Sequence, residues 1–390
     1  MKQVTEEIKD MAAEKESLRR MAEEAAALLR RMVAVPSPSF GEEAVCSLLC
    51  SYLAEKQIPF ERTGNNIVAE HIVDSTKPTL MLCAHIDTVL PASGYDFDPF
   101  SPDRSQAAEV VSRMTGKEIS DPDEIVAGLG SNDDGASCAA MIQTFIYTVN
   151  NKIKTNLTLA LTCEEEKSGK DGMTSLWDMR LNRINHAIVG EPTGMKAAIS
   201  ERGLLVIDAE ALGESGHAAR NEGENSIYIA MEDIARILGH KFTRPSRMGD
   251  INLNVTQICA GTAHNVIPDR CTFVIDIRPN ESYSNAEILE ELQGICRSDL
   301  KARNLSNRSS ATAQDSPLTG ICRRTGTETF HSPTTSDWMR IGCDAIKMGP
   351  GDSSRSHRKN EFVFVGEIEK GIEKYIEFVN EYGKQFNTME

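Results

Sequence analysis

Apolar runs in the first half of the chain predict strands that are buried on both faces. The two clearest runs are TLMLCAHIDTV at 79–89 and LTLALTCEEE at 157–166, and HAIVGEPT at 186–193 is a shorter third. Continuous apolar strands are typical of parallel sheets, because helices cover both faces of such a sheet. A helical run rich in small residues, DGASCAAMIQTFIYTV at 134–149, lies between the first two. This alternation predicts an α/β fold with a mainly parallel sheet.

Near Ala197 the pattern changes. GLLVIDAEALG at 203–213 alternates apolar and polar residues, as a strand does when only one of its faces is buried. Further strands and helices are predicted in the segments INLNVTQICAG, CTFVIDIRP, NSIYIAMEDIARIL and NAEILEELQGICRSDL. Together they indicate a small α+β module, an antiparallel sheet covered by two helices.

Helices and one long connection complete the predicted organisation. A helix is expected from about Val4 to Val33, where the prolines of VPSPSF end it, and an amphipathic helix closes the chain. The polar stretch from Pro91 to Asp123 is interpreted as an irregular surface connection. The predicted domains are a larger one in two parts, 1–196 and 313–390, and the module inserted between them at 197–312.

Composition and charge narrow the function classes. The 390 residues carry a formal net charge of −16, which argues against binding to nucleic acid or to anionic membranes. The N-terminal segment MKQVTEEIKDMAAEKESLRR has no apolar core of a secretory signal, and no apolar stretch approaches the length of a bilayer span. Ten cysteines without a CxxC pair are interpreted as reduced thiols, so we expect a cytoplasmic protein.

Side chains that bind metals follow the predicted parallel strands. They are His85 and Asp87, Asp133 and Asp134, Glu164 to Glu166, Glu191 and, in a loop near the C-terminus, His357. In an open parallel sheet, ligands bind outside the carboxyl ends of the strands. Each motif alone is weak, since acidic runs and Gly-Asp turns are mostly solvated surface. Their joint occurrence at strand ends indicates a site for two zinc ions bridged by one carboxylate.

The ordered motifs resemble those of a known superfamily. AHIDTV, GLGSNDDG, TCEEE, VGEPT, GESGHAAR, GTAHNVIPDR and GPGDSSRSHRKNE are similar to the acetylornithine deacetylase / succinyl-diaminopimelate desuccinylase / glutamate carboxypeptidase superfamily of two-zinc amidohydrolases. The resemblance runs from about Val35 to the C-terminus and looks closest to the acetylornithine deacetylase-like members. It implies a zinc-dependent exopeptidase-like catalytic domain and an inserted lid and dimerisation domain, and hence a homodimer.

The resemblance also implies roles for the metal ligands. His85 and Glu191 would bind one zinc ion, Glu165 and His357 the other, and Asp133 would bridge both. The peptide bond between Asp133 and Asp134 would be cis. Co²⁺ or Mn²⁺ would suit the same ligands.

Catalytic roles follow from the same resemblance. Asp87 would orient the ring of His85, and Glu164 would be the general base. Because three glutamates stand in a row, the pair of base and ligand is either Glu164 and Glu165 or Glu165 and Glu166. The first pair is preferred here by counting from Thr162.

The inserted module supplies candidates for substrate contacts. His217 matches a histidine that reaches the substrate carbonyl from the partner subunit in relatives. Asn265 and Arg278 match positions that contact the substrate carboxylate, and a guanidinium suits that planar group. Arg355 is a weaker candidate, for the acyl group, because it lies two residues from His357.

The implied activity is hydrolysis of the amide of an N-acyl amino acid in arginine biosynthesis. N-acetylornithine, N-succinylornithine and the corresponding citrulline derivatives are the expected substrates. A dipeptidase or carboxypeptidase and a succinyl-diaminopimelate desuccinylase share the same chemistry and remain open. A catalytically silent metal-binding relative is the alternative outside enzymes, but it would be expected to lack a ligand or the base.

Overall fold

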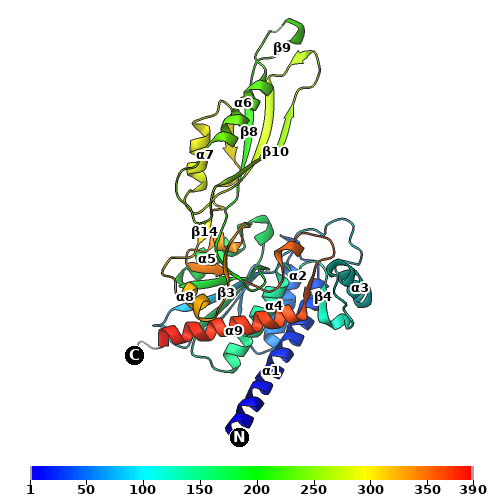
Figure 1. The fold of residues 1–390 in the computed structure, drawn as a ribbon, viewed down its shortest axis with the longest axis vertical. Coiled ribbons are helices and arrows are strands. Elements are labelled where there is room, and N and C mark those ends of the chain that lie inside the picture. The colour runs from blue at the N-terminus through cyan, green and yellow to red at the C-terminus, as the bar shows by residue number, and fades with distance from the viewer. Residues whose placement is uncertain (1, 221, 388–390) are drawn as a thin grey trace. The chain divides into compact units, whose positions relative to one another are not determined.

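The computed structural model describes residues 2–220 and 222–387 and divides the chain into two compact units (Figure 1). The larger unit consists of Met1–Ile199, Thr312–Phe330 and Ser336–Glu390. The smaller unit consists of Ser200–Ala311 and His331–Thr335. The chain therefore leaves the larger unit after Ile199 and returns to it, as an inserted module requires.

The larger unit is built on a sheet whose central strands are parallel. The order along it within this unit is β1-β2-β5-β3-β6-β16-β7, with β15 paired to β7. Strand β3 pairs in parallel with β5 and β6, and β6 pairs in parallel with β16, while β1 and β2 are antiparallel. The strands are β1 (Glu61–Thr63), β2 (Asn66–His71), β3 (Thr79–His85), β5 (Asn156–Thr162), β6 (His186–Val189), β7 (Ala197–Glu201), β15 (Thr329–Ser332) and β16 (Asp344–Lys347).

Helices cover both faces of this sheet, which explains the continuous apolar runs. In β3, Leu80 and Leu82 belong to the hydrophobic cluster that α1, α2, α4, α8 and α9 build on one face. Met81 and Cys83 belong to the cluster of α5 and Trp338 on the other face. The helices are α1 (Lys2–Val33), α2 (Glu43–Glu55), α4 (Gly135–Asn150), α5 (Met173–Met179), α8 (Pro317–Arg324) and α9 (Val365–Asn387).

A third, smaller cluster corrects one expectation. The segment 91–123, expected to be irregular, contains helix α3 (Arg104–Thr115). Asp103 caps this helix by accepting a hydrogen bond from the Gln106 backbone N–H at 2.9 Å. Its buried residues pack against the two-stranded antiparallel sheet of β4 (Ile125–Ala127) and β17 (Phe362–Phe364). The apolar face is short and sits in a polar segment, so the sequence pattern alone did not reveal it.

The smaller unit is an antiparallel sheet covered by α6 (Ser226–Gly239) and α7 (Asn285–Gln293). The strand order is β10-β12-β8-β13. The strands are β8 (Leu205–Leu212), β10 (Asn252–Ala260), β12 (Arg270–Arg278) and β13 (Asp299–Ala302), with a separate pair of β9 (Gly216–His217) and β11 (Val266–Ile267). The helix expected over 285–300 ends earlier, and its last residues instead begin β13, which was not predicted.

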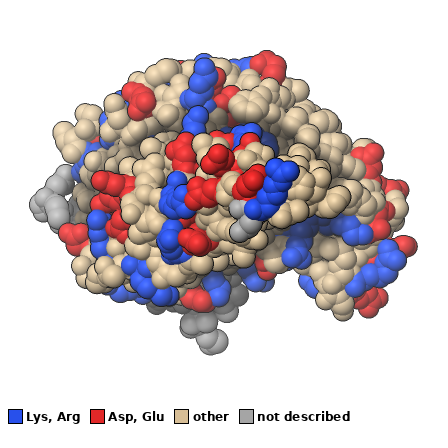
Figure 2. All heavy atoms as spheres, turned by 90° about the horizontal axis from the view of Figure 1, so that it is seen from above, with Lys and Arg blue, Asp and Glu red and all other residues tan. Residues whose placement is uncertain are grey.

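The architecture confirms the expected fold class, a mainly parallel α/β unit with an α+β unit inserted in it. Among the described residues, no helix is both long and apolar enough to cross a membrane. Acidic and basic side chains are interspersed over the face shown in Figure 2. This face carries many basic groups although the net charge of the chain is −16.

Asp233 fastens α6 to the turn before β13, and this contact gives a stability prediction. Its buried carboxylate accepts hydrogen bonds from Arg297 N at 3.0 Å and from Ser298 N and Oγ at 2.7 and 2.6 Å. Asp233→Ala leaves these donors without their acceptor, so we expect a loss of about 3 kcal/mol in the free energy of unfolding. Urea unfolding followed by far-UV circular dichroism measures it.

The neighbouring Glu232 provides the control. Its carboxylate is exposed and contacts Arg236 at 3.2 Å, so Glu232→Ala is expected to cost less than about 0.5 kcal/mol. Equal losses in the two variants would contradict the role given to Asp233.

Candidate metal centre

The metal-binding candidates lie at the carboxyl ends of neighbouring parallel strands. His85 ends β3, and its partner in the register is Thr162, the last residue of β5. Val189 ends β6 and is paired with Cys83 of β3. The register therefore brings the glutamates after Thr162, and Glu191 after Val189, to the same edge of the sheet as His85.

Two further segments complete this edge. Asp133 lies in the turn before α4, and His357 lies in the loop before β17. The peptide bond between Asp133 and Asp134 is cis, which confirms that expectation. All of these residues belong to the larger unit.

The first group of candidate ligands consists of His85, Asp133 and Glu191. One donor atom of each lies within 4.8 Å of those of the other two. His85 Nε2 lies 3.2 Å from Asp133 Oδ1. Burial raises the pKa of Glu191 well above its ordinary value, and the charge of Asp133 raises it further. Such a carboxyl ionises readily only beside a compensating cation.

The second group consists of Asp133, Glu166 and His357, again with donor atoms within 4.8 Å. His357 Nε2 lies 3.0 Å from Glu166 Oε2 and 3.8 Å from Asp133 Oδ2. Asp133 is thus shared, with Oδ1 directed to His85 and Oδ2 to His357. This is the arrangement that a carboxylate needs to bridge two ions.

The second group differs from the sequence prediction, which named Glu165 as the ligand beside His357. The structure brings Glu166 there instead. The reason is local: Glu164 has a φ of +63° and starts a tight turn, so the alternation of β5 no longer sets the side-chain directions. The open alternative, the pair Glu165 and Glu166, is the one that fits this geometry.

Glu164 and Glu165 have different surroundings. The Glu164 carboxylate accepts a hydrogen bond from the Asp171 backbone N–H at 3.1 Å, outside both groups. Burial raises the pKa of Glu165 well above its ordinary value, and the charges of Glu191 and Asp337 raise it further. Glu165 therefore lies among the carboxylates of the site, whereas the Glu164 carboxylate, expected to be the general base, is bound outside both groups.

Asp87 holds the turn that carries both glutamates. Its buried carboxylate accepts hydrogen bonds from Glu165 N at 3.0 Å, Glu166 N at 3.1 Å and Ser39 Oγ at 2.7 Å. His85 Nδ1 is 3.0 Å from the Asp87 backbone oxygen and 3.4 Å from Oδ1. Burial acts to raise the pKa of Asp87, but the bonds from His85, Ser39 and the backbone outweigh it and lower the pKa.

Two buried glutamates that the sequence analysis did not identify hold the other segments. Glu361 Oε1 accepts the backbone N–H groups of Asn132 and Asp133, both at 2.9 Å. Glu42 Oε1 accepts the N–H groups of Phe40 and Glu164 at 2.8 and 3.1 Å. In the sequence, each of these glutamates is marked only by its place at the border of an apolar run. Acidic residues at such borders are also common on protein surfaces.

Arg355, the candidate for the acyl group, is engaged elsewhere. Its guanidinium donates to both carboxylate oxygens of Glu367, at 2.6 and 3.1 Å, and lies over the ring of Phe362. Its proximity to His357 in the sequence does not make it part of either group of ligands.

The candidates in the smaller unit separate into two places. His217 on β9 is exposed and pairs with Val266 on β11, so Asn265 is close to it. Arg278 ends β12 and donates to Asp276 at 2.8 and 3.1 Å. Strand β12 begins at Arg270, three residues after the end of β11. Arg278 lies eight residues further on, or about 26 Å along the strand. The structure therefore brings His217 and Asn265 together but not Arg278.

The donor set fits a pair of divalent cations. Imidazole and carboxylate are ligands of zinc and of the related transition ions. Here the carboxylates of Asp133, Glu165, Glu166 and Glu191 converge beside His85 and His357, and the positive charge of Lys347 also acts on Glu191. The four carboxylates outnumber this one lysine, which leaves excess negative charge in a largely buried place. Two dications would compensate that charge.

Comparisons with known proteins agree with this reading. The model described as "Peptidase dimerisation domain" matches residues 199–304, and that of "Peptidase family M28" matches residues 66–190. A putative [LysW]-lysine/[LysW]-ornithine hydrolase of Pyrobaculum aerophilum is 25% identical, over 88% of this chain and 93% of its own. A succinyl-diaminopimelate desuccinylase of Wolbachia pipientis is 26% identical over 83% of each chain. An acetylornithine deacetylase of Photorhabdus laumondii is 24% identical over 90% and 96%.

Solved structures share the fold over almost the whole chain. The M20 family metallo-carboxypeptidase Sso-CP2 of Sulfolobus solfataricus superposes with a TM-score of 0.70 at 17% identity, over 93% of this chain and 99% of that one. The aminopeptidase PepT of Bacillus cereus gives 0.71 at 18%, over 93% and 98%. The chain is therefore similar in sequence and in fold to metal-dependent hydrolases that act on amide bonds.

Glu361 offers a test of how the turn at Asp133 is held. Glu361→Ala removes the acceptor of two buried N–H groups, so we expect a loss of about 2–4 kcal/mol in unfolding free energy and weaker metal retention. Glu361→Gln keeps a carbonyl oxygen and is expected to lose less. Urea unfolding and metal analysis after dialysis measure both effects.

Lys359→Ala is the matched control in the same loop, because the ammonium group of this exposed lysine pairs with the exposed Asp96, at 3.2 Å. If Glu361→Ala behaved like Lys359→Ala in both measurements, Glu361 would not be what holds the turn.

Proposed function

We propose that the protein is a two-zinc deacylase that hydrolyses the amide of an N-acyl amino acid, with N-acetylornithine or a close relative as substrate. The observation that carries this proposal is the position of Asp133, with one carboxylate oxygen toward each group of ligands. The substrate class is supported by the relatives, because two of the three named above carry ornithine in their names. A cytoplasmic role in arginine biosynthesis would follow from such a substrate.

In the proposed site, His85 and Glu191 hold one ion, Glu166 and His357 hold the other, and Asp133 bridges them. When bound, two zinc ions lower the pKa of water between them and polarise the substrate carbonyl. Asp87 keeps Glu165 and Glu166 in place through their backbone N–H groups.

Glu165 takes the role of general base in this proposal. Its carboxylate would accept a proton from the attacking water and return it to the departing amine. Burial and the neighbouring carboxylates raise its pKa, which favours return of the proton to the departing amine. Glu164 is bound to Asp171 N and is not proposed for this step.

The smaller unit would contribute substrate contacts. We propose that the exposed His217 and the neighbouring Asn265 reach the substrate bound by a partner subunit, in a homodimer formed through the dimerisation domain. Arg278 donates to Asp276 through Nε and Nη2, so a substrate carboxylate would pair with the edge of the guanidinium that carries Nη1. The second candidate function is a dipeptidase or carboxypeptidase, favoured by the likeness to the M20 metallo-carboxypeptidase.

The three consecutive glutamates give a direct test of the roles. Glu165→Gln is expected to lower kcat by at least about 10²-fold while two zinc ions stay bound, because only the proton acceptor is lost. Glu166→Gln is expected to lose one ion. Glu164→Gln keeps an oxygen for Asp171 N and is expected to retain activity and both ions. Steady-state kinetics and metal analysis on the same preparations measure this.

The opposite result would be an inactive Glu164→Gln variant with both ions bound and a Glu165→Gln variant that has lost an ion. It would contradict the roles proposed here and would make Glu164 the general base and Glu165 a metal ligand.

Amine release identifies the substrate class. We expect chelator-sensitive release from N-acetylornithine, or from the acetyl- or succinyl-derivatives of ornithine or citrulline. Succinyl-diaminopimelate and simple dipeptides are the comparison substrates, and restoration by zinc is the control for the chelator. Release from dipeptides alone would move the protein to the peptidases and contradict the proposed substrate.

A further inference from the structure

The loop that carries His357 has little regular structure of its own. Between β16 and β17 it contains a short 3₁₀ turn at Ser353–Arg355, and His357 itself is exposed with a φ of +58°. The position of His357 therefore depends on contacts from other segments. The buried side chain of Asn132, one residue before Asp133, makes three hydrogen bonds to this loop.

Two of these bonds pair Asn132 with both backbone groups of Asp352. Asn132 Oδ1 accepts a hydrogen bond from Asp352 N at 2.9 Å, and Asn132 Nδ2 donates to Asp352 O at 3.1 Å. The amide side chain thus pairs with the loop as the backbone of a neighbouring strand would. Gly351 permits this approach, because it has a φ of +91° and a Cβ there would lie 2.4 Å from Asn132 Oδ1.

The third bond leads to the bridging carboxylate. Asn132 Nδ2 lies 3.4 Å from Ser356 Oγ, and the Ser356 hydroxyl also hydrogen-bonds the side chain of Asp133. An amide nitrogen can only donate and a hydroxyl has one proton, so Ser356 accepts from Asn132 and donates to Asp133. Asn132 therefore acts on both ligands that the second group takes from loops, on Asp133 through Ser356 and on His357 through the loop backbone.

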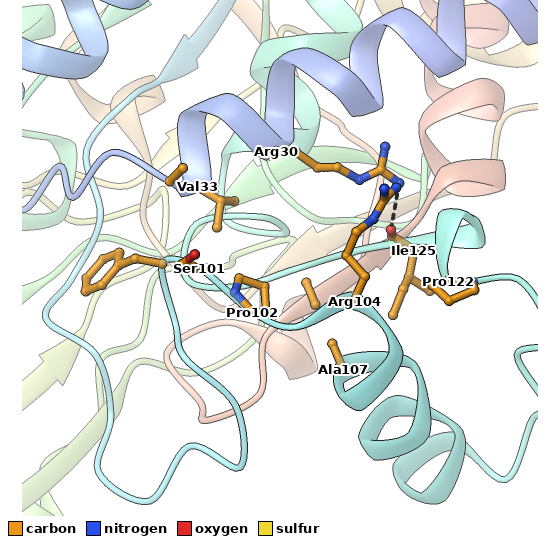
Figure 3. Close-up of a pocket in the computed structure, with 11 residues that line it drawn as sticks. Arg30, Val33, Ser101, Pro102, Arg104, Ala107, Pro122 and Ile125 are labelled. Carbon is orange, nitrogen blue, oxygen red and sulfur yellow. Dashed lines mark hydrogen bonds between the residues drawn. The ribbon is translucent and has the colours of Figure 1, made fainter.

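The turn that carries Asn132 is fixed from its other side. Strand β4 leads into this turn, and Arg30 of α1 donates to the backbone oxygen of Ile125 in β4 at 3.1 Å, at the edge of the pocket in Figure 3. Further along, Leu129 N donates to Pro99 O at 2.8 Å. The amide of Asn132 is thus presented to the loop from a backbone that is itself well held.

We propose that Asn132 is a positioning residue for the second ion, the one assigned to Glu166 and His357. It acts by pairing the loop of His357 with the turn of Asp133, without binding a metal itself. The first ion depends on it less, because His85 ends β3 and Glu191 follows β6, so the sheet positions both of its other ligands. This inference rests on the two-ion site of the proposed function.

The test measures the zinc affinities of the metal-free protein by competition with a chromophoric chelator. Asn132→Asp keeps the size and one oxygen of the side chain but loses the donor to Asp352 O and Ser356 Oγ. We expect the affinity for the second ion to fall by about 10–100-fold, as when other outer partners of metal ligands are lost, and that for the first ion to fall less. Ser356→Ala removes one of the two links, so a smaller loss is expected.

Two further variants provide the controls. Asn151→Asp makes the same exchange at the exposed C-cap of α4, where Asn151 Nδ2 donates to Tyr147 O at 2.9 Å, and should leave both affinities unchanged. Glu166→Gln identifies the ion that is affected. This variant is expected to keep only the first ion, so adding Asn132→Asp to it should change the remaining affinity little.

Hydrogen exchange of the metal-free protein gives a readout that needs neither zinc nor turnover. Asn132→Ala removes the acceptor of Asp352 N, so faster amide exchange is expected in the segment 351–357 but not in β3 or β5. In the kinetic assay, the activity that Asn132→Asp loses at limiting zinc should return at excess zinc, because its ligands and general base are intact.

Three results would overturn the proposal. One is an equal loss, or no loss, of the two zinc affinities in Asn132→Asp. Another is unchanged exchange of the segment 351–357 in Asn132→Ala. The third is a wild type that binds a single zinc ion, which would also contradict the two-zinc function, whereas the first two results leave that function standing. If the Asn132 variants do not fold, Ser356→Ala decides, and an unchanged second affinity in it would contradict the proposal.

Discussion

The metal centre depends on buried carboxylates that accept backbone N–H groups. Asp87 holds the turn of Glu165 and Glu166, Glu361 holds the turn of Asp133, and Glu42 holds the start of the Glu164 turn. A buried carboxylate is costly unless it is well paired, and a charge-assisted bond to a backbone donor is among the stronger interactions available. These carboxylates, together with the strands, therefore fix where the ligands point.

The strands bring the candidate ligands to one edge of the sheet, and the loops set the positions of the individual side chains. Parallel pairing of β3 with β5 and β6 brings their carboxyl ends to one edge, so His85 needs only its strand to reach the site. Asp133 and His357 come from loops far apart in the sequence, and Glu361 connects them, because it follows the His357 loop and binds the backbone of Asp133. The two metal groups share Asp133 and are therefore built as one unit.

The sequence patterns predict the fold wherever the burial of a strand's faces decides which of its residues are apolar. The runs in β3 and β5 are apolar throughout since helices cover both faces, and β8 alternates since one face is covered. The pattern failed where a capping side chain and a short apolar face decide the structure, as in α3, and where a helix ends early, as before β13.

The candidate site could be predicted to the level of segments. His85, Asp133, Glu191 and His357 fall in the two groups because each stands alone, or first, at its place in the sequence. The three glutamates after Thr162 could not be told apart, since the left-handed conformation of Glu164 sets which side chain turns inward. Glu42 and Glu361 act on backbone groups, and residue spacing carries no sign of such a role.

The central claim is that Asp133 bridges two ions, one held with His85 and Glu191 and the other with Glu166 and His357. Anomalous diffraction at the zinc edge from crystals grown with zinc tests it most directly. The account predicts two anomalous peaks, one on each side of the Asp133 carboxylate, with Glu166 and not Glu165 bound to the second. A single peak, or a second ion bound through Glu165, would contradict it.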